Sequence, residues 1–215
     1  MKEVYDKYLN NELKLETWQK IGVICLVIVI TGIFGWLYEF IFYYFNSGMK
    51  EFYWRGANFL PWINIYATGS IMIMMLTKKY KKHPLLVFLI AFISTGILEY
   101  FTGLAMYKLM NGIRCWDYNT EILNFGNIGG FVCLRSVTFF GLSALLLIYG
   151  IVPTCIYLST KIKKEFFLAF TITICFIFLF DELYNLIFAK LLNLPRSVDL
   201  YKNIGIKYMD YYKNK

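Results

Sequence analysis

Long apolar runs without any charge fill this chain and limit the folds that it can adopt. Three of them, 21–38, 56–77 and 136–160, contain no acidic or basic residue. A helix that crosses a membrane needs about 20 mostly apolar residues. Only 17% of the residues are charged, against about 25% in a soluble domain. The sequence therefore predicts an all-α fold, a polytopic bundle of transmembrane helices.

Two further apolar runs, 84–98 and 166–180, have about 15 residues each and reach spanning length only if they continue past their own carboxylates. We therefore expect five spanning helices, at about 20–45, 58–77, 84–107, 133–158 and 166–190. The chain then divides into an amphipathic cytoplasmic segment 1–20, a transmembrane domain 20–190 and a tail 191–215. This tail is basic and rich in tyrosine, and we expect it at the membrane interface.

The lysines of two short loops predict the orientation, because cytoplasmic loops of membrane proteins are enriched in Lys and Arg. Loops 78–83 and 159–165 carry these lysines and should be cytoplasmic, together with the N-terminus. The tail opposes this assignment, since its five positive residues, together with Lys190 just before it, would lie outside. Short loops orient helices more strongly than distant charges, and a re-entrant segment would also resolve the conflict.

Carboxylates recur at similar depth in three of the expected spans. Glu39 lies in the first span, Glu99 in the third, and Asp181 with Glu182 in the fifth. At about 1.5 Å per residue they lie roughly 21 to 27 Å from the cytoplasmic ends of their helices. This is the outer third of a hydrocarbon core about 30 Å thick, where ionisable groups are rare without a partner or a function. We expect these carboxylates to share a polar site near the outer leaflet.

Counter-charges and polar side chains follow on the same expected side. The candidate ligand-binding or ion-pair pocket consists of Glu39, Arg55, Glu99, Trp116, Asp117, Tyr118, Asn127 and Arg135, with Tyr66, Asp181 and Glu182 as secondary members. The arginines would bind an anionic group, and Glu39 and Glu99 would fix the arginines or exchange protons. Two other interpretations stay open: ion pairs that only lock the bundle, and side chains that reach the membrane interface.

Several chemistries have no motif in this sequence. There is no P-loop, no His-Glu-x-x-His zinc motif and no Ser–His pair, so we assign no catalytic residue, metal or cofactor. No basic stripe with base-stacking residues suggests a nucleic-acid partner. The five cysteines lack metal-type spacing, and a disulfide between Cys115 and Cys133 is left open.

Ordered motifs over about 35–141 resemble a known family. Gly35, Trp36 and Glu39 match a Gly-Trp-x-x-Glu element. The other matches are Arg55, Gly56, Pro61, Ile65, Tyr66, Gly69, Glu99, Tyr100, Gly103, Trp116, Asp117 and Tyr118. In these residues the chain resembles the bacterial membrane family labelled putative ABC transporter type IV. It departs from the family pattern at Phe131, which replaces an arginine, and Arg135 lies one helical turn further on.

The resemblance implies a permease-like, multi-pass component of a transport system in the bacterial plasma membrane. Without a P-loop, ATP hydrolysis would need a separate ATPase chain, which would dock on loops 78–83 and 159–165. The lipid bilayer is the other expected partner, and a homo-oligomer is left open. Two alternatives remain. One is a membrane-embedded enzyme for a lipid or lipid-linked substrate, with Glu99 or Asp117 as general acid or base. The other is a non-catalytic interaction or immunity-type membrane protein.

Overall fold

The protein is mostly α-helical in its computed structural model, which describes residues 1–109, 112–208 and 212–213. Among these residues, four helical segments are long and apolar enough to cross a membrane. They are α2 (Thr17–Asn46), α4 (Pro84–Leu109), Leu134–Lys161 and Lys164–Leu191. The third segment joins α5 (Leu134–Leu146), a π-helical turn (Leu147–Ile151) and α6 (Val152–Lys161). The fourth joins α7 (Lys164–Leu183), a π-helical turn (Tyr184–Phe188) and α8 (Ala189–Leu191). The prediction of a polytopic helix bundle is confirmed.

The second expected span, 58–77, is helical only in its C-terminal part, α3 (Asn64–Thr77). Its 14 residues measure about 21 Å, less than the thickness of a bilayer core. Residues 58–63 are not helical because other elements bind their backbone donors. Asp181 accepts two of these N–H groups, and Ile63 donates to the carbonyl of Gly32. The proline in this segment also has no N–H and favours an extended residue before it.

The chain forms two compact units. Unit 1 comprises Met1–Met72 and Tyr149–Met209, and unit 2 comprises Ile73–Ile148 and Asp210–Lys215. The chain passes from one unit to the other inside α3 and inside the π-helical turn Leu147–Ile151. Pro153 follows this turn, and a proline both lacks an N–H and displaces the carbonyl four residues earlier, which favours a wider turn.

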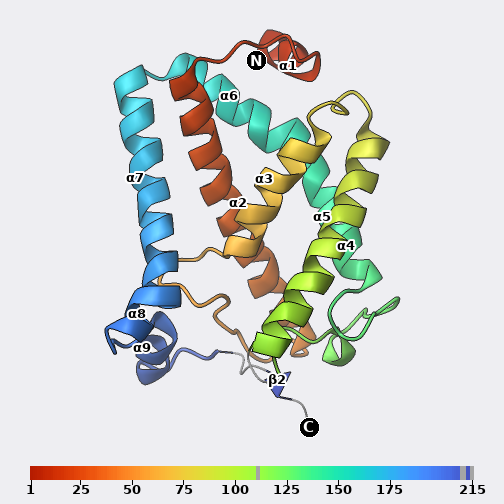
Figure 1. The fold of residues 1–215 in the computed structure, drawn as a ribbon, viewed down its shortest axis with the longest axis vertical. Coiled ribbons are helices and arrows are strands. Elements are labelled where there is room, and N and C mark those ends of the chain that lie inside the picture. The colour runs from red at the N-terminus through yellow and green to blue at the C-terminus, as the bar shows by residue number, and fades with distance from the viewer. Residues whose placement is uncertain (110–111, 209–211, 214–215) are drawn as a thin grey trace. The chain divides into compact units, whose positions relative to one another are not determined.

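In unit 1, α2 packs against α7 and α6, as Figure 1 shows. Buried side chains of this unit form a core of Val29, Trp62, Ala67 and Phe178. The amide of Gln19 donates to the Ser159 hydroxyl at 3.3 Å, so the start of α2 lies beside the end of α6. Helix α1 (Lys2–Leu9) packs against α6 with Tyr8 buried. The N-terminal segment and loop 159–165 thus share one end of unit 1.

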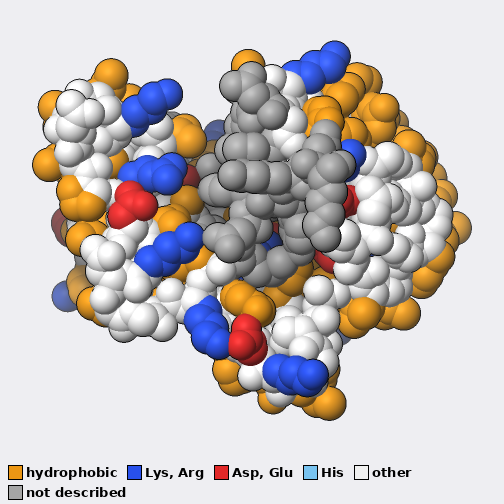
Figure 2. All heavy atoms as spheres, turned by 90° about the horizontal axis from the view of Figure 1, so that it is seen from below, with side chains coloured by type: hydrophobic (Ala, Val, Ile, Leu, Met, Phe, Trp, Pro, Cys, Tyr) orange, Lys and Arg blue, Asp and Glu red, His pale blue; other side chains and the backbone are white. Residues whose placement is uncertain are grey.

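The opposite end of unit 1 holds the loop after α2 together with the C-terminal segment. Helix α9 (Ser197–Asn203) contributes Tyr201, whose hydroxyl donates to the Phe59 carbonyl at 2.6 Å. The Trp54 N–H donates to the Lys207 carbonyl at 2.8 Å. Figure 2 shows Lys and Arg side chains gathered around α8 and α9, with hydrophobic side chains on the flanks. The outside location of this end, like the cytoplasmic N-terminus, stays a prediction.

Unit 2 is built on an antiparallel pair of helices, α4 and α5. A Cβ added to Gly96 would lie 3.0 Å from Val137, and one added to Gly141 would lie 2.6 Å from Phe88. Small residues at these positions let the two helices approach closely. The loop between them, 112–133, contains two short elements, β1 (Ile113–Arg114) and the 3₁₀ helix η1 (Tyr118–Thr120). Strand β1 pairs with β2 (Tyr212–Lys213). This loop carries most of the polar groups described next for unit 2.

Candidate polar sites in the two units

An ion pair in unit 1 joins Glu39, in α2, to Arg55, in the following loop. Arg55 Nε and Nη2 each lie 2.9 Å from Glu39 Oε2, and the guanidinium lies 3.8 Å from the centre of the Tyr43 ring. Burial lowers the pKa of Arg55. The charge of Glu39 and the neighbouring tyrosines raise this pKa by more than burial lowers it, so the pKa lies above its usual value. Arg55 therefore stays charged.

A glycine positions the third member of this pair. The Tyr66 hydroxyl, from α3, donates to Glu39 Oε1 at 3.2 Å. A Cβ added to Gly35 would overlap the Tyr66 ring. Because Gly35 lies one helical turn before Glu39, the ring can cross α2 at the glycine and reach the carboxylate. The Gly-Trp-x-x-Glu element thus has a local structural role in this chain.

Asp181, in α7, holds the non-helical segment 58–63 of unit 1. Its Oδ1 accepts from the Phe59 N–H at 2.9 Å and from Asn185 Nδ2 at 2.9 Å. Its Oδ2 accepts from the Leu60 N–H at 2.9 Å and from Trp62 Nε1 at 3.1 Å. All four partners are N–H groups, so Asp181 acts here only as an acceptor.

The neighbouring Glu182 binds the two ends of the same segment. It accepts from Asn58 Nδ2 at 2.6 Å and from Asn64 Nδ2 at 3.0 Å. Asn58 Nδ2 also donates to the Trp62 carbonyl at 3.2 Å. Asn64 is the first residue of α3, and a negative charge is favourable near a helix N-terminus. Two adjacent carboxylates of one helix therefore fix both the non-helical segment and the start of α3.

This non-helical segment reaches the middle of the neighbouring spanning helix. Ile63 donates its N–H to the Gly32 carbonyl at 3.0 Å. Gly32 lies about 22 Å from the start of α2 and about 21 Å from its end, at 1.5 Å per residue. A Cβ on Gly32 would also come within 3.2 Å of Trp62. Non-helical backbone at such depth needs protein partners or a water-lined cavity, and here protein groups supply the partners.

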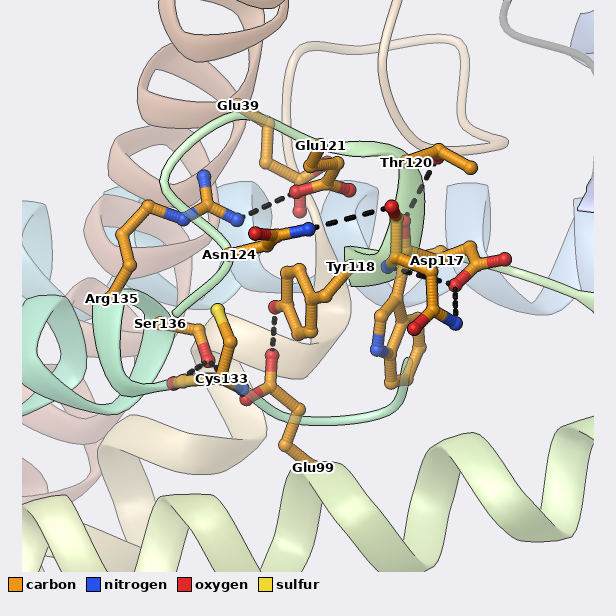
Figure 3. A network of polar contacts seen from close by, with 12 residues as sticks. Glu39, Glu99, Asp117, Tyr118, Thr120, Glu121, Asn124, Cys133, Arg135 and Ser136 are labelled. Atoms are coloured by element: carbon orange, nitrogen blue, oxygen red, sulfur yellow. Dashed lines mark hydrogen bonds and ion pairs between the residues drawn. The ribbon is translucent and has the colours of Figure 1, made fainter. Parts of the chain in front are cut away.

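Glu99, in α4, is the buried carboxyl group of unit 2, with 6% of its surface exposed. Figure 3 shows the Tyr118 and Ser136 hydroxyls directed at it. Tyr118 donates to Oε1, and Ser136 Oγ lies 2.8 Å from Oε2. Ser136 Oγ is also 2.9 Å from the Cys133 carbonyl and accepts the Cys133 N–H at 3.3 Å. Hydroxyl groups thus surround this carboxyl, in contrast to the N–H groups around Asp181.

Arg135, at the start of α5, pairs with Glu121 of the 112–133 loop. Its Nη2 lies 2.6 Å from Glu121 Oε2, and the Glu121 side chain is 1% exposed (Figure 3). The Arg135 guanidinium also lies 5.2 Å from the centre of the Tyr118 ring. The loop is therefore fastened to α5 by a buried ion pair next to the Glu99 site.

A second ion pair and a glycine shape the rest of the 112–133 loop. Arg114 Nη1 donates to the Gly129 carbonyl at 2.6 Å and lies 3.8 Å from Asp117 Oδ1. Gly130 has a φ of +80°, and a Cβ there would collide with the side chains of Arg114 and Asp117. Only glycine suits such a position without strain.

The predicted site residues fall into both units. Glu39, Arg55 and Tyr66 meet in unit 1, where Asp181 and Glu182 bind segment 58–63. In unit 2, Glu99 meets Tyr118, Asp117 pairs with Arg114, and Arg135 pairs with Glu121. Trp116 Nε1 donates to the Phe131 carbonyl at 2.9 Å, and Asn127 Nδ2 to Asn119 Oδ1 at 2.7 Å. Ligand binding by any of these residues stays a prediction.

Other residues of these sites were not identified from the sequence: Asn58, Asn64, Glu121, Ser136 and Asn185. Two of them carried a usable signal, because Asn58 and Asn64 interrupt an otherwise apolar run. Glu121 stands among several polar loop residues, and no signal in the sequence distinguished it from them. Cys115 and Cys133 do not form a disulfide with each other. Within the described residues, no group of three or more His, Cys, Asp or Glu side chains is arranged to hold a metal ion.

Comparison with known proteins gives one family. The family described as "Putative ABC-transporter type IV" matches residues 26–186, which include parts of both units and most of each long apolar segment. Searches of curated proteins and of solved structures returned no match. Four apolar helices and this match together show a membrane protein with a transport-related role. The chain belongs to the Putative ABC-transporter type IV family.

Proposed function

We propose that this chain is the permease-like membrane component of a bacterial transport system in the plasma membrane. The observation that carries this proposal is the interrupted span of unit 1. Segment 58–63 is non-helical at the middle of α2, and α3 starts there as a helix of 14 residues. Many transporters form their binding sites from such discontinuous helices. A span that serves only as an anchor has no need of this interruption.

Arg55 and Glu39 form the part of unit 1 that would bind a ligand. A guanidinium has five N–H donors in a fixed planar arrangement that suits carboxylates and phosphates. Arg55 uses Nε and Nη2 for Glu39. An anionic ligand would compete with Glu39 for this arginine, and Tyr66 would hold the displaced carboxylate. Arg135, Glu99, Asp117, Trp116, Tyr118 and Asn127 would form the corresponding polar surface of unit 2.

The energy source in this proposal is a separate ATPase chain that docks on loops 78–83 and 159–165. In loop 78–83, Lys79 and Lys82 are exposed, whereas Lys81 is buried. Burial, with a smaller contribution from the charge of Lys78, lowers the pKa of Lys81 to about 8. The exposed lysines are therefore the ones that would meet acidic groups of a partner.

Mild-detergent purification of the full chain from its native cell tests this proposal. We expect a stoichiometric ATPase to co-purify and to be lost from the double variant Lys79→Glu, Lys82→Glu. The matched control is Lys190→Glu, a charge reversal at the exposed residue in α8. Recovery of the chain without any ATPase activity, from cells that express it at native level, would refute the ATP-driven function.

A further inference from the structure

Loop 112–133 lies beside α4 rather than beyond its end. A Cβ added to Gly103, which stands before the last turn of α4, would lie 2.9 Å from the Phe131 side chain and 3.0 Å from that of Trp116. Val132 reaches further along the helix, because its side chain would lie 3.9 Å from a Cβ on Gly96. The loop therefore folds back along the side of α4, towards the middle of the helix.

The lysines before α4 indicate the depth of these contacts. The exposed lysines of loop 78–83 directly precede Pro84, the first residue of α4, and keep the start of the helix at the membrane surface. At 1.5 Å per residue, Gly96 lies about 18 Å and Gly103 about 28 Å from this start. The hydrocarbon core is about 30 Å thick, and a tilt of α4 would reduce both depths. The part of loop 112–133 that contacts these glycines therefore lies within the core.

The non-helical backbone of this part of the loop has protein partners. Ile128 donates its N–H to the Val132 carbonyl at 2.9 Å, and its own carbonyl accepts from the Phe131 N–H at 3.1 Å. The Leu134 N–H donates to the Phe125 carbonyl at 3.0 Å. Irregular backbone at membrane depth is tolerated only where protein or water supplies such partners. The loop meets this condition with its own backbone groups.

Polar and apolar side chains of this part of the loop have different surroundings. Asn127 Nδ2 donates to Asn119 Oδ1 at 2.7 Å, and Asn127 Oδ1 accepts the Gly130 N–H at 2.7 Å, so this amide is used inside the loop. Residues 122–134 include no charged side chain. Three large apolar side chains are more than half exposed: Leu123, Phe125 and Ile128. The loop thus turns an apolar edge outwards and keeps its amides inside, as a surface in contact with hydrocarbon would.

This apolar edge continues the exposed side of α5. Leu134, Leu142 and Leu146 are exposed and follow one another at multiples of four residues, which places them on one ridge of the helix. The ridge belongs to a segment that is long and apolar enough to cross a membrane, so it faces lipid. Leu134 meets the loop at Phe125, and a Cβ on Gly126 would lie 3.2 Å from the Leu134 Cβ. The lipid-facing ridge therefore extends onto the loop.

We propose that loop 112–133 is embedded in the membrane and that its apolar edge, formed by Leu123, Phe125 and Ile128, contacts lipid acyl chains. The edge then separates the polar network of the loop from the hydrocarbon. Depth and continuity with the ridge of α5 favour lipid over a soluble partner, which does not reach the hydrocarbon core. This contact goes beyond the proposed function, because it needs neither a substrate nor an ATPase.

Photocrosslinking to lipid tests this contact. The photoreactive residue p-benzoylphenylalanine replaces Phe125 or Ile128 in the full chain, in vesicles of phosphatidylethanolamine and phosphatidylglycerol. After irradiation, mass spectrometry should find lipid adducts at both positions in a yield similar to that at Ile93, an exposed residue about 14 Å along α4. Lys79, in the exposed loop before α4, is the control outside the core and should give a much lower yield.

Yields at Phe125 and Ile128 as low as that at Lys79 would overturn the proposal. A cross-link to a second copy of the chain in place of lipid would overturn it as well. Only chains that are monodisperse in size-exclusion chromatography are irradiated, and either loop position is sufficient if the other variant does not fold. The measurement uses no transport or ATPase activity, so failure of the proposed function would leave its result unchanged.

Discussion

Asp181 in unit 1 and Glu99 in unit 2 are both buried carboxyl groups on membrane-spanning helices, with 5% and 6% of their surfaces exposed. They differ in what surrounds them. Asp181 has four N–H partners, which can only donate, whereas the partners of Glu99 are two hydroxyls. The first arrangement requires an acceptor at every position and fixes the backbone around it. The second arrangement is compatible with both the protonated and the ionised form of the carboxyl group.

Asp181→Asn should give the largest loss of stability. The new NH₂ group would replace an oxygen that accepts two hydrogen bonds, so two buried donors would lose their acceptor. Each unsatisfied donor costs about 1–3 kcal/mol of unfolding free energy. We expect a clearly lower Tm and a lower yield of monodisperse protein. Asp6→Asn, in exposed α1, is the matched control and should change the unfolding free energy by no more than about 0.5 kcal/mol. Equal Tm values for the two variants would contradict the role of Asp181.

Glu182→Gln should have an intermediate effect. The new NH₂ group faces only one of the two asparagines, whose amide can rotate to present its oxygen, while the other asparagine still donates to the glutamine oxygen. A rotated Asn58 would give up its bond to the Trp62 carbonyl, which is 3.2 Å away. One lost buried hydrogen bond predicts a decrease of about 1–2 kcal/mol in unfolding free energy. Thermal unfolding beside Glu12→Gln, an exposed control, measures this decrease. A loss as large as that of Asp181→Asn would show that the asparagines cannot rotate.

The long helices were predictable because apolar runs of spanning length leave few alternatives. The expected span 84–107 corresponds to Pro84–Leu109. Its acidic residue, Glu99, indicated a polar site because carboxylates are rare at such depth. The expected start of the second span, at 58, was too early. Asn58, Pro61 and Asn64 interrupt the apolar run, but it was not predictable that Asp181, far away in the sequence, binds the N–H groups of segment 58–63.

The choice of ion-pair partners was likewise beyond the sequence. Arg135 pairs with Glu121, an acid that was not among the predicted residues of the pocket. That choice depends on the path of the 112–133 loop, which turns at Gly130 with a positive φ. Glu39 and Arg55 were expected in one pocket, but periodicity and spacing do not give the geometry of an irregular loop.

Tyr118→Phe removes one of the two hydroxyls at Glu99 and should cost about 1 kcal/mol of unfolding free energy, since Ser136 remains. The control is Tyr100→Phe, which follows Glu99 on α4 and has its ring against Phe131. Thermal unfolding of both variants measures the difference. An equal Tm for the two variants would contradict a stabilising role of the Tyr118 hydroxyl.

Glu99→Gln should have the smallest effect on stability, although it removes a buried carboxyl group. The glutamine amide can donate to Ser136 Oγ while its oxygen accepts from Tyr118, so both hydroxyls keep a partner. We expect a change within about 0.5 kcal/mol, against the large loss in Asp181→Asn. Thermal unfolding of the two Asp/Glu-to-amide variants side by side therefore measures the difference between N–H and hydroxyl surroundings directly. If Glu99→Gln were as damaging as Asp181→Asn, the hydroxyls could not exchange their roles. Glu99 would then be a fixed carboxylate that locks α4 to α5.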